Sequence, residues 1–335
     1  MYKYVYSFKI QDDDENYQPV VLVTGCSSGI GFALARHLIS ETNYRLVLTA
    51  REKSIGVLQT EFVESDRVWI LPLDIVSEES RLRAVKEIFK RWGRVDVLIN
   101  NAGISYRSVL EEMLDRDELL QMQTNYLGPV GLIRLLLPRM RQNGRGKIIN
   151  ISSVSGMLAM PTMASYSASK FALEGAMEAL WYETRPFGID VVLVQPGFVR
   201  SRSHERVKYS VRSRVSNSNA SGKARPYTTM YRYMAHFIGR MMKHGFATPD
   251  SIAHLVLYVI RTKQPPLWVP AAFDAEFFYY LKRFFPRRLV LPFFYWFLPG
   301  SKNWGSGFTR KRRRRSLLGR VWDRVTTARE ESHVN

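Results

Sequence analysis

The chain of 335 residues contains a single cysteine, Cys26. One thiol cannot close an intramolecular disulfide, and it cannot supply the cluster of cysteines that holds a structural zinc ion. A cysteine-based zinc cluster is therefore excluded, and no metal ligands are predicted among the other residues. Cys26 lies inside a glycine-rich turn with no neighbouring base in the sequence, so we expect an unreactive thiol.

Long apolar segments are also lacking. The first 19 residues include an acidic run at 12–15 and lack the apolar core of a secretory signal, so we expect a chain that stays in the cytoplasm. The longest uncharged stretch near the C-terminus covers residues 289–301 and contains two prolines. A membrane-spanning helix needs about 20 apolar residues, so none is expected there.

Acidic residues are scarce relative to basic ones. The chain has 49 Lys and Arg residues against 30 Asp and Glu residues, which gives a formal net charge of +19. Part of the excess is an uninterrupted basic run, RKRRRR, at residues 310–315. Such a run can bind nucleic acid or anionic lipid. No recognised nucleic-acid-binding module surrounds it, so specific nucleic-acid binding is not expected.

What the chain does contain is an alternation of apolar strands and helical patterns. Most strands are continuous in Val, Ile and Leu, which is typical of a parallel sheet covered by helices on both faces. This order predicts a single α/β domain over residues 19–275, a Rossmann-type doubly wound parallel sheet. The predicted strands are 20–24, 46–50, 68–71, 95–100, 147–152, 191–195 and 267–269. The predicted helices are 30–41, 78–92, 116–141, 164–185 and 249–263.

Two motifs point to chemistry. Residues 24–31, TGCSSGIG, form a glycine turn between a strand and a helix. Such a turn brings backbone N–H groups and a helix N-terminus up to a pyrophosphate. Tyr166 and Lys170 are four residues apart and so share one face of a helix, where the ammonium lowers the pKa of the phenol. Together the motifs indicate a dinucleotide site beside a tyrosine acid/base.

Further polar motifs occur at or just beyond the ends of predicted strands, on the side where ligands bind. They are the sequence NNAG at residues 100–103, Asn125, Ser153 and the pair Pro196-Gly197. Each of these residues alone has a simpler explanation, such as a turn serine or a capping asparagine, just as Tyr166 alone would be a surface tyrosine. Their combination in one order and spacing favours a shared site.

In that order and spacing, these motifs resemble those of the short-chain dehydrogenase/reductase family, over residues 20–230. The resemblance implies that Tyr166 is the general acid/base and that Lys170 lowers its pKa and holds the nicotinamide ribose. It implies that Ser153 polarises the substrate carbonyl and that Asn125 holds a water molecule that connects Lys170 to solvent. The cofactor-binding residues expected from the resemblance are Gly25, Ser27, Ser28, Gly29, Ile30, Gly31, Arg51, Asp74, Asn101, Ala102, Gly103, Tyr166, Lys170, Pro196, Gly197, Val199 and Ser201.

The end of the second predicted strand indicates which cofactor is used. An NAD site carries an acidic residue there to bind the ribose 2′-hydroxyl, whereas this chain has Ala50 and Arg51. Arginine suits a 2′-phosphate, which a carboxylate would repel, so NADP(H) is predicted over NAD(H). Asp74 is then expected to meet the adenine amine. The glycine turn has Ser28 where many NADP(H) members carry Lys or Arg, and Ser201 has the place of the family's threonine.

Four segments stand apart from the strand and helix alternation. Residues 1–18 are expected to be a mobile arm, with an added edge strand as the alternative. Residues 198–230 are polar, basic and rich in serine, which favours a substrate-binding lid over a disordered insertion. Residues 276–308 are dense in aromatic side chains, and residues 309–335 form a basic tail.

The aromatic segment predicts a peripheral membrane contact through residues 276–315, at the cytoplasmic face. In the alternative, its side chains pack onto the catalytic domain and close the substrate pocket or a subunit interface. A membrane-facing mouth suggests a lipophilic alcohol or ketone, and within the family the chain looks most like hydroxysteroid and retinol dehydrogenases. Family members often pair through two long helices, so a homodimer is possible on this resemblance.

The predicted function is an NADP(H)-dependent oxidoreductase that interconverts an alcohol and its carbonyl on a steroid-, retinoid- or lipid-like substrate. The alternative is a protein at a membrane surface that binds NADP(H) without catalysis. The intact set of Asn125, Ser153, Tyr166 and Lys170 argues for the enzyme, since a pure binder has no need of all four.

Overall fold

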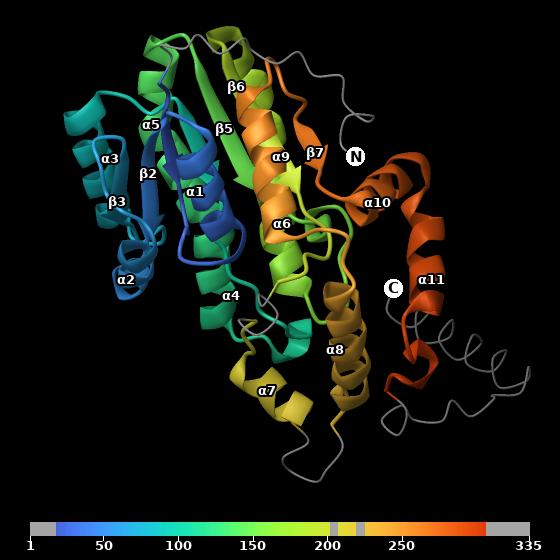
Figure 1. The fold of residues 1–335 in the computed structure, drawn as a ribbon. Coiled ribbons are helices and arrows are strands. Elements are labelled where there is room, and N and C mark those ends of the chain that lie inside the picture. Colours follow the sequence, from blue (N-terminus) through green and yellow to red (C-terminus); the bar gives the residue numbers. More distant parts are fainter. Residues whose placement is uncertain (1–17, 202–206, 219–224, 306–335) are drawn as a thin grey trace, which may run out of the picture.

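The computed structural model describes residues 18–201, 207–218 and 225–305. Its centre is a parallel sheet with the strand order β3-β2-β1-β4-β5-β6-β7 (Figure 1). The order runs in opposite directions on the two sides of β1 and β4, so the crevice between their carboxyl ends is where such sheets bind ligands. The strands are β1 (Val20–Val23), β2 (Arg45–Ala50), β3 (Val68–Pro72), β4 (Val97–Asn100), β5 (Gly146–Ile151), β6 (Ile189–Gln195) and β7 (Trp268–Pro270).

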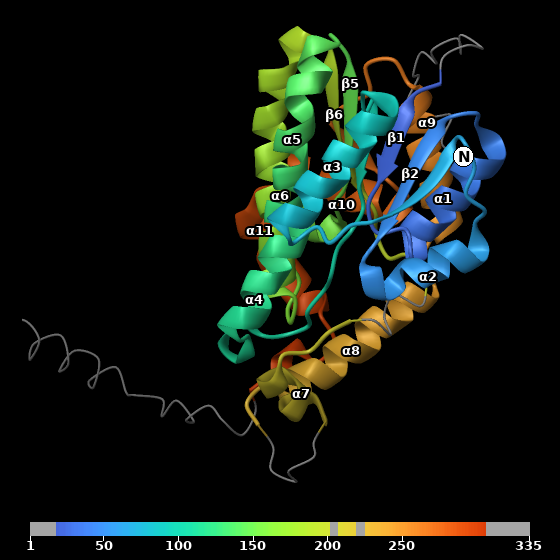
Figure 2. The ribbon, with the colours of Figure 1, turned by 90° about the vertical axis from the view of Figure 1, so that its left-hand side faces the viewer.

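Helices cover both faces of this sheet, as Figures 1 and 2 show. On one face, α1 (Gly29–Glu41), α2 (Glu52–Glu61) and α9 (Pro249–Arg261) share one apolar cluster with the strands. On the other face, α3 (Glu78–Trp92), α5 (Gly128–Gln142) and α6 (Ala164–Thr184) share a second cluster. The predicted doubly wound parallel sheet is therefore confirmed.

The predicted helix over 116–141 is wrong in one respect. It is divided into α4 (Asp115–Met122), a π-helical turn η3 (Gln123–Leu127) and α5. Apolar periodicity continues through the turn, so the sequence pattern did not reveal the interruption. Single π-turns occur frequently at functional sites, and this one carries Asn125.

The segments outside the predicted alternation are largely helical where they are described. The predicted lid contains α7 (Val211–Ser218) and the start of α8 (Thr228–Lys243). The aromatic segment forms α10 (Phe273–Phe284) and α11 (Arg287–Phe297), so its first helix begins three residues before the predicted boundary at 276. The remaining short helices are η2 (Leu110–Glu112), η4 (Val154–Gly156), η5 (Arg185–Phe187) and η7 (Ser301–Asn303).

Two predicted segments lie outside the described residues: nearly all of the N-terminal arm, and the tail from residue 306 onward. None of the described helices combines the length and apolar character that crossing a bilayer requires.

A buried lysine joins the sheet to α9. The Nζ atom of Lys147, on β5, donates to the carbonyl oxygens of Val259, Ile260 and Thr262 at 3.0, 2.8 and 2.6 Å. These carbonyls lie at the C-terminal end of α9, where helix carbonyls lack i+4 partners, and that of Val259 also accepts from Thr262 N at 3.3 Å. Lys147 therefore caps α9 from inside the molecule.

Candidate active site

The glycine turn follows β1 and has a backbone that only glycine accommodates well. Gly25 and Gly29 have φ angles of +73° and +59°. A Cβ atom on Gly31 would lie 2.4 Å from the carbonyl oxygen of Gly25. Cys26 is fully buried in this turn, and burial raises the pKa of its thiol to about 12. The thiol is therefore a packed, unreactive side chain, as expected.

The N-terminus of α1 opens from this turn with backbone donors free for a ligand. Ser28 is the N-cap residue and makes no capping hydrogen bond with its side chain. Ser27 and Ile30 flank it and are partly buried. The first N–H groups of a helix attract anions, so the turn fits the pyrophosphate of a dinucleotide.

The NNAG motif after β4 is hydrogen-bonded to the glycine turn. The Nδ2 atom of Asn101 donates to the carbonyl oxygens of Thr24 and Gly25 at 2.9 and 3.0 Å. The Oγ1 atom of Thr24 accepts from the backbone N–H groups of Asn101 and Ala102. These bonds hold the backbone after β1 and the backbone after β4 together at the point where the strand order reverses. Because the residues there are small, a cofactor has room to lie against this backbone.

Tyr166 and Lys170 lie on one face of α6, as predicted. The Nζ atom of Lys170 is 6.0 Å from the centre of the Tyr166 ring and donates to the carbonyl oxygen of Ile151 at 2.8 Å. Lys170 is only 6% exposed. The side chain of Ser153, at the end of β5, makes a hydrogen bond with the Tyr166 phenol. Three of the four predicted catalytic residues are therefore adjacent.

The pKa of Tyr166 differs from the expectation. Burial raises the pKa of the phenol above its usual value, and the hydrogen bond with Ser153 opposes this only in part. Burial also lowers the pKa of Lys170 to about 8, against the charge of Glu174. The lysine was expected to acidify the phenol, but its ammonium is directed at a backbone carbonyl, and the effect of burial on the phenol is larger.

Asn125 connects the π-turn to the neighbouring loop and to α6. Its side chain exchanges two hydrogen bonds of 2.9 Å with the backbone of Ile104, and its Nδ2 atom donates to Oγ of Ser169 at 2.9 Å. A Cβ atom on Gly103 would lie 3.4 Å from Asn125 Oδ1. Asn125 thus packs against the turn of α6 that carries Lys170. The water molecule assigned to it stays a prediction.

Sequence reasoning missed Glu174, a buried carboxylate one helical turn beyond Lys170. Its Oε1 atom accepts hydrogen bonds from Ser152 Oγ at 2.6 Å and from Gln195 Nε2 at 2.8 Å. Burial raises its pKa. The signal that could have identified Glu174 in the sequence is its position, four residues after Lys170 on a buried helix. Its two partners, however, come from the ends of β5 and β6, far away in the sequence.

The pair Pro196-Gly197 follows β6 and is joined to α10. The carbonyl oxygen of Pro196 accepts from Val154 N at 2.9 Å. Asp274 Oδ2 accepts from Phe198 N at 2.7 Å, and a Cβ atom on Gly197 would lie 2.1 Å from that oxygen. Asp274 was also missed from the sequence. Downstream, Val199 pairs with Ala247, and Ser201 is the last described residue before the first gap in the lid.

The far end of the cofactor crevice is cationic. Arg51 is exposed as the N-cap residue of α2. Asp74 is exposed after β3, and its Oδ1 atom accepts from Val76 N at 3.0 Å. Burial lowers the pKa of Lys208, the charges of Arg51 and Lys53 lower it further, and the charge of Asp117 opposes them, so Lys208 lies near two cations and one carboxylate. Neither Lys53 nor Lys208 was predicted to be part of the cofactor site. Lys208 in particular comes from the lid region, far from Arg51 in the sequence.

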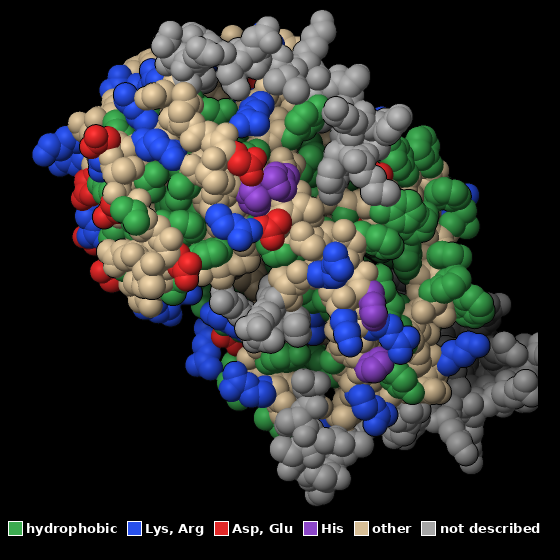
Figure 3. Space-filling view, viewed as in Figure 1, with side chains coloured by type: hydrophobic (Ala, Val, Ile, Leu, Met, Phe, Trp, Pro, Cys, Tyr) green, Lys and Arg blue, Asp and Glu red, His purple; other side chains and the backbone are tan. Residues whose placement is uncertain are grey.

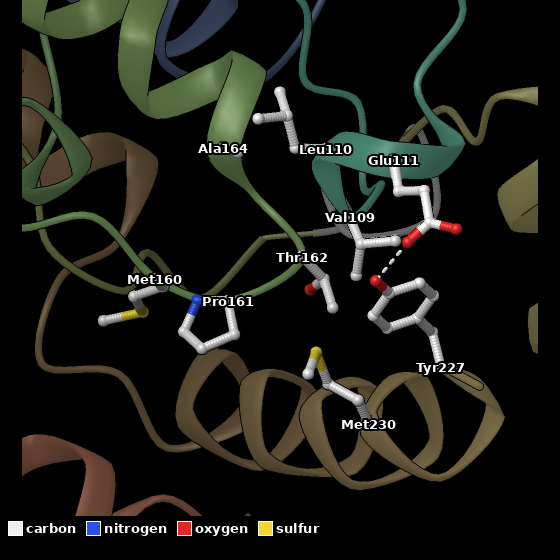
Figure 4. Close-up of a pocket in the computed structure, with 9 residues that line it drawn as sticks. All are labelled: Val109, Leu110, Glu111, Met160, Pro161, Thr162, Ala164, Tyr227 and Met230. Carbon is white, nitrogen blue, oxygen red and sulfur yellow. Dashed lines mark hydrogen bonds between the residues drawn. The ribbon is translucent and has the colours of Figure 1, made fainter. Parts of the chain in front are cut away.

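An open pocket of about 610 Å³ adjoins the start of α6 (Figure 4). Ala164, on its wall, is two residues before Tyr166. Tyr227 lies on the opposite wall and donates a hydrogen bond to Glu111, which also lines the pocket. The wall is mostly apolar and is built from η2, the loop before α6 and the lid. The lining residues are Val109, Leu110, Glu111, Met160, Pro161, Thr162, Ala164, Tyr227 and Met230.

Comparison with known proteins decides the family. The sequence model described as short chain dehydrogenase matches residues 19–210, more than half of the chain. The chain belongs to the short-chain dehydrogenase family. It is accordingly an NAD(P)-dependent dehydrogenase/reductase, as the resemblance predicted.

Relatives within the short-chain dehydrogenase family support this assignment. A 3-ketodihydrosphingosine reductase of Bacteroides thetaiotaomicron is 34% identical over 74% of this chain and 85% of its own length. Retinol dehydrogenase 8 of Bos taurus is 32% identical over 74% of this chain and 79% of its own length.

Solved structures of short-chain dehydrogenases show the same fold. A short-chain dehydrogenase from Streptomyces avermitilis superposes with a TM-score of 0.65 and 30% identity, over 78% of this chain and 91% of that one. A metagenomic short-chain oxidoreductase in complex with NADP has a TM-score of 0.55 and 27% identity, over 76% and 96%.

Proposed function

We propose that this enzyme interconverts a lipophilic alcohol and its carbonyl with NADP(H), and that Tyr166 is the general acid/base. The observation that carries the proposal is the arrangement of Tyr166, Ser153 and Lys170. The phenol is hydrogen-bonded to Ser153 and lies on the same helix face as the buried ammonium. Ala164, two residues before Tyr166 on the same helix, lines the apolar pocket. Asn125, which is hydrogen-bonded to Ser169 on that helix, lies beside Gly103 of the NNAG motif, and this motif is hydrogen-bonded to the glycine turn.

The nicotinamide supplies the hydride when it is bound, and the protein supplies position and a proton. In the reducing direction, the Tyr166 phenol donates its proton to the oxygen that develops from the carbonyl. The Ser153 hydroxyl hydrogen-bonds to that same oxygen and polarises the carbonyl. Lys170 stabilises the phenolate that remains. Because burial raises the pKa of Tyr166, the phenol is protonated at neutral pH, which favours its role as the acid.

The proposed preference for NADP(H) rests on the cationic cluster of Arg51, Lys53 and Lys208. Three close positive charges at the outer end of the crevice suit a 2′-phosphate and have no partner in NAD(H). Asp74 lies at the end of β3, where it would meet the adenine amine.

A lipophilic substrate is supported by the pocket wall and by the names of relatives. Met160, Pro161, Ala164 and Met230 give the pocket an apolar wall with few polar atoms. The two relatives carry names that refer to a long-chain ketone and to retinol, both lipid-like molecules. A screen of NADPH oxidation with steroid, retinoid, long-chain acyl and small aromatic carbonyls would identify the class.

The substitution Tyr166→Phe tests the proposed function. It removes the proton donor and keeps the ring, so turnover should fall by roughly a thousandfold or more while the Kd for NADPH stays nearly unchanged. Tyr182→Phe, on the exposed side of the same helix, is the matched control and should leave turnover intact. Substantial turnover by Tyr166→Phe would refute the assigned acid/base. NADPH binding without turnover of any carbonyl by the wild type would favour the non-catalytic alternative.

We also place the enzyme in the cytoplasm, in keeping with a single buried thiol that forms no disulfide. A homodimer through the long helices stays a prediction from the family resemblance. Light scattering on the full chain would give its mass directly.

A further inference from the structure

The outward faces of α10 and α11 are apolar and exposed. Of the 21 large apolar side chains that are exposed in the described residues, 11 fall between 273 and 297. Figure 3 shows them gathered at the right-hand edge of the molecule, over α10 and α11. Those on α11 are between 52% and 64% exposed: Leu289, Leu291, Phe293, Tyr295, Trp296 and Phe297. A patch of this density marks an interaction surface.

The exposure is not the result of a poorly packed helix. Val290 on the inner side of α11 is buried, and the ring of Phe294, one turn later, lies 5.8 Å from that of Phe278 on α10. Leu298 continues this inner line and packs in a cluster with Phe198 and Met234. The inner face of α11 therefore packs on the molecule through the buried Val290 and the partly buried Phe294 and Leu298. The outer face carries a second apolar surface that the described residues leave uncovered.

The charges around this surface are mostly positive. Residues 273–305 contain five Lys and Arg residues, against a buried Asp274 and a partly exposed Glu276 in the first turn of α10. Lys282 and Arg287 extend beside α6, with their charged groups 5.4 and 5.8 Å from the ring of Phe171. A second copy of the chain docked through this surface would bring like charges together. Anionic lipid headgroups would instead neutralise them.

We propose that the outer face of α10 and α11 docks on an anionic lipid bilayer, with its aromatic rings at headgroup depth. The helices have 12 and 11 residues, whereas about 20 are needed to span the hydrocarbon core. They therefore lie in the interface plane, where Trp and Tyr side chains are favoured and Lys and Arg meet the headgroups.

The docking surface is joined to the catalytic site through its inner face. Ala275 packs with Val154, the residue after Ser153. Phe278 and Leu298 belong to the same apolar cluster as Met160 and Met230, which line the pocket. The pocket wall and the inner side of the docking helices are thus one continuous apolar body. A lipophilic substrate would reach the pocket from the bilayer along this side, a consequence that rests on the proposed function.

The test is sedimentation of the full chain with phosphatidylcholine vesicles, with and without phosphatidylserine. The double variant Phe293→Ser/Trp296→Ser removes two outward rings and none of the packed inner ones. Its control is Tyr182→Ser/Phe187→Ser, which removes two aromatic rings that are exposed elsewhere. The measurement is repeated in about 1 M salt, where the screening length is about 3 Å and attraction through the basic residues is suppressed.

At high salt, the wild type and the control should stay bound to vesicles that contain phosphatidylserine. The variant Phe293→Ser/Trp296→Ser (the α11 variant) should partition onto these vesicles roughly tenfold or more weakly than the wild type. At high salt the charges are screened, so the apolar contact that this variant lacks is the main attraction left. Equal sedimentation of all three proteins would overturn the proposal. So would a wild-type dimer that the α11 variant converts to monomer without any change in vesicle binding, since a second copy would then be the occupant.

Activity on a water-soluble carbonyl separates the two proposals. The α11 variant should retain it, because neither residue belongs to the catalytic set. Loss of vesicle binding by the variant, with no carbonyl turnover by the wild type, would refute the proposed reaction and support the docking surface.

Discussion

Lys170 depends on a residue that does not touch the substrate site. Burial lowers the pKa of Lys170 to about 8, and the charge of Glu174 acts in the opposite direction. Glu174 in turn is held by hydrogen bonds from Ser152 and Gln195, at the ends of two strands. The carboxylate is thus a fixed support for the ammonium that must remain charged in the reaction.

We expect Glu174→Gln to narrow the pH range of activity. Without the carboxylate charge, the pKa of Lys170 falls further, so the ammonium loses its proton at lower pH. The alkaline limb of kcat/KM against pH should therefore move down by roughly half a unit or more. Glu178→Gln, one turn further along α6 and exposed, is the control. An unmoved alkaline limb in Glu174→Gln would show that the carboxylate has only a packing role.

A second prediction concerns Arg51 and the cofactor preference. The substitution Arg51→Asp replaces a cation of the Arg51, Lys53 and Lys208 cluster with a charge that repels a 2′-phosphate. The Kd for NADPH should rise at least tenfold, as expected when a hydrogen bond to a charged group worth about 1.5–3 kcal/mol is lost. The Kd for NADH should stay nearly the same. Lys86→Asp on α3 controls for net charge, and fluorescence titration with both cofactors measures the effect. Tighter binding of NADH than NADPH by the wild type would contradict the assignment.

The spacing of the motifs was enough to bring Ser153, Tyr166 and Lys170 together. The residues that it missed have a common property: each acts through a partner distant in the sequence. Asp274 contacts the backbone of Phe198, 76 positions earlier. Lys208 joins Arg51 from the opposite part of the fold. Such contacts depend on tertiary packing and leave no local pattern.

At the scale of elements, strands and buried helices were predictable because their apolar periodicity reports which faces are covered. Helix α3 has the predicted bounds. The helices on the rim were not predicted: α2 has an exposed surface, and α10 and α11 are apolar on more than one side. A helix is recognised in a sequence by polar residues that recur on one side, and a segment that is aromatic on every side lacks this pattern. Pro292 inside α11 is a further signal against a helix.

The contact between β5 and α9 is an element-scale feature that can be tested. Lys147→Met keeps the aliphatic stem but removes the buried donor from the carbonyls of Ile260 and Thr262. It also removes the cation that lies 4.0 Å from Asp190 Oδ2. We expect the free energy of unfolding to fall by about 2–4 kcal/mol, because buried carbonyls lose a charged hydrogen-bond donor. Denaturant titration measures this change. Lys263→Met, which removes an exposed ammonium just beyond α9, should cost far less. Equal losses in the two variants would contradict the capping role.

At the scale of the whole molecule, the doubly wound parallel sheet followed from the alternation of strands and helices, whereas the order of its strands was not predicted. The position of the C-terminal helices was not predicted either, because it depends on the packing of Ala275 and Phe278 against residues around the site. The sequence left two explanations of the aromatic segment, a membrane contact or packing on the catalytic domain, and the membrane contact stays a proposal. The inner side of the segment packs on the catalytic domain and its outer side is exposed.

The net charge of +19 gives the last prediction, because a long basic run and an apolar surface respond differently to salt. Each Lys or Arg near an anionic membrane contributes about 1 kcal/mol, and that contribution falls within a screening length. Neutralising Arg312, Arg313, Arg314 and Arg315 to Ser should therefore weaken vesicle binding at low salt and leave binding at about 1 M salt unchanged. The variant Phe293→Ser/Trp296→Ser should lose the salt-resistant part. Neutralising the exposed residues Arg83, Lys86 and Lys90 on α3 and Arg134 on α5 removes the same number of charges and controls for net charge alone. If the arginine variant lost binding at both salt concentrations, the basic run and not the α11 surface would hold the protein on the membrane.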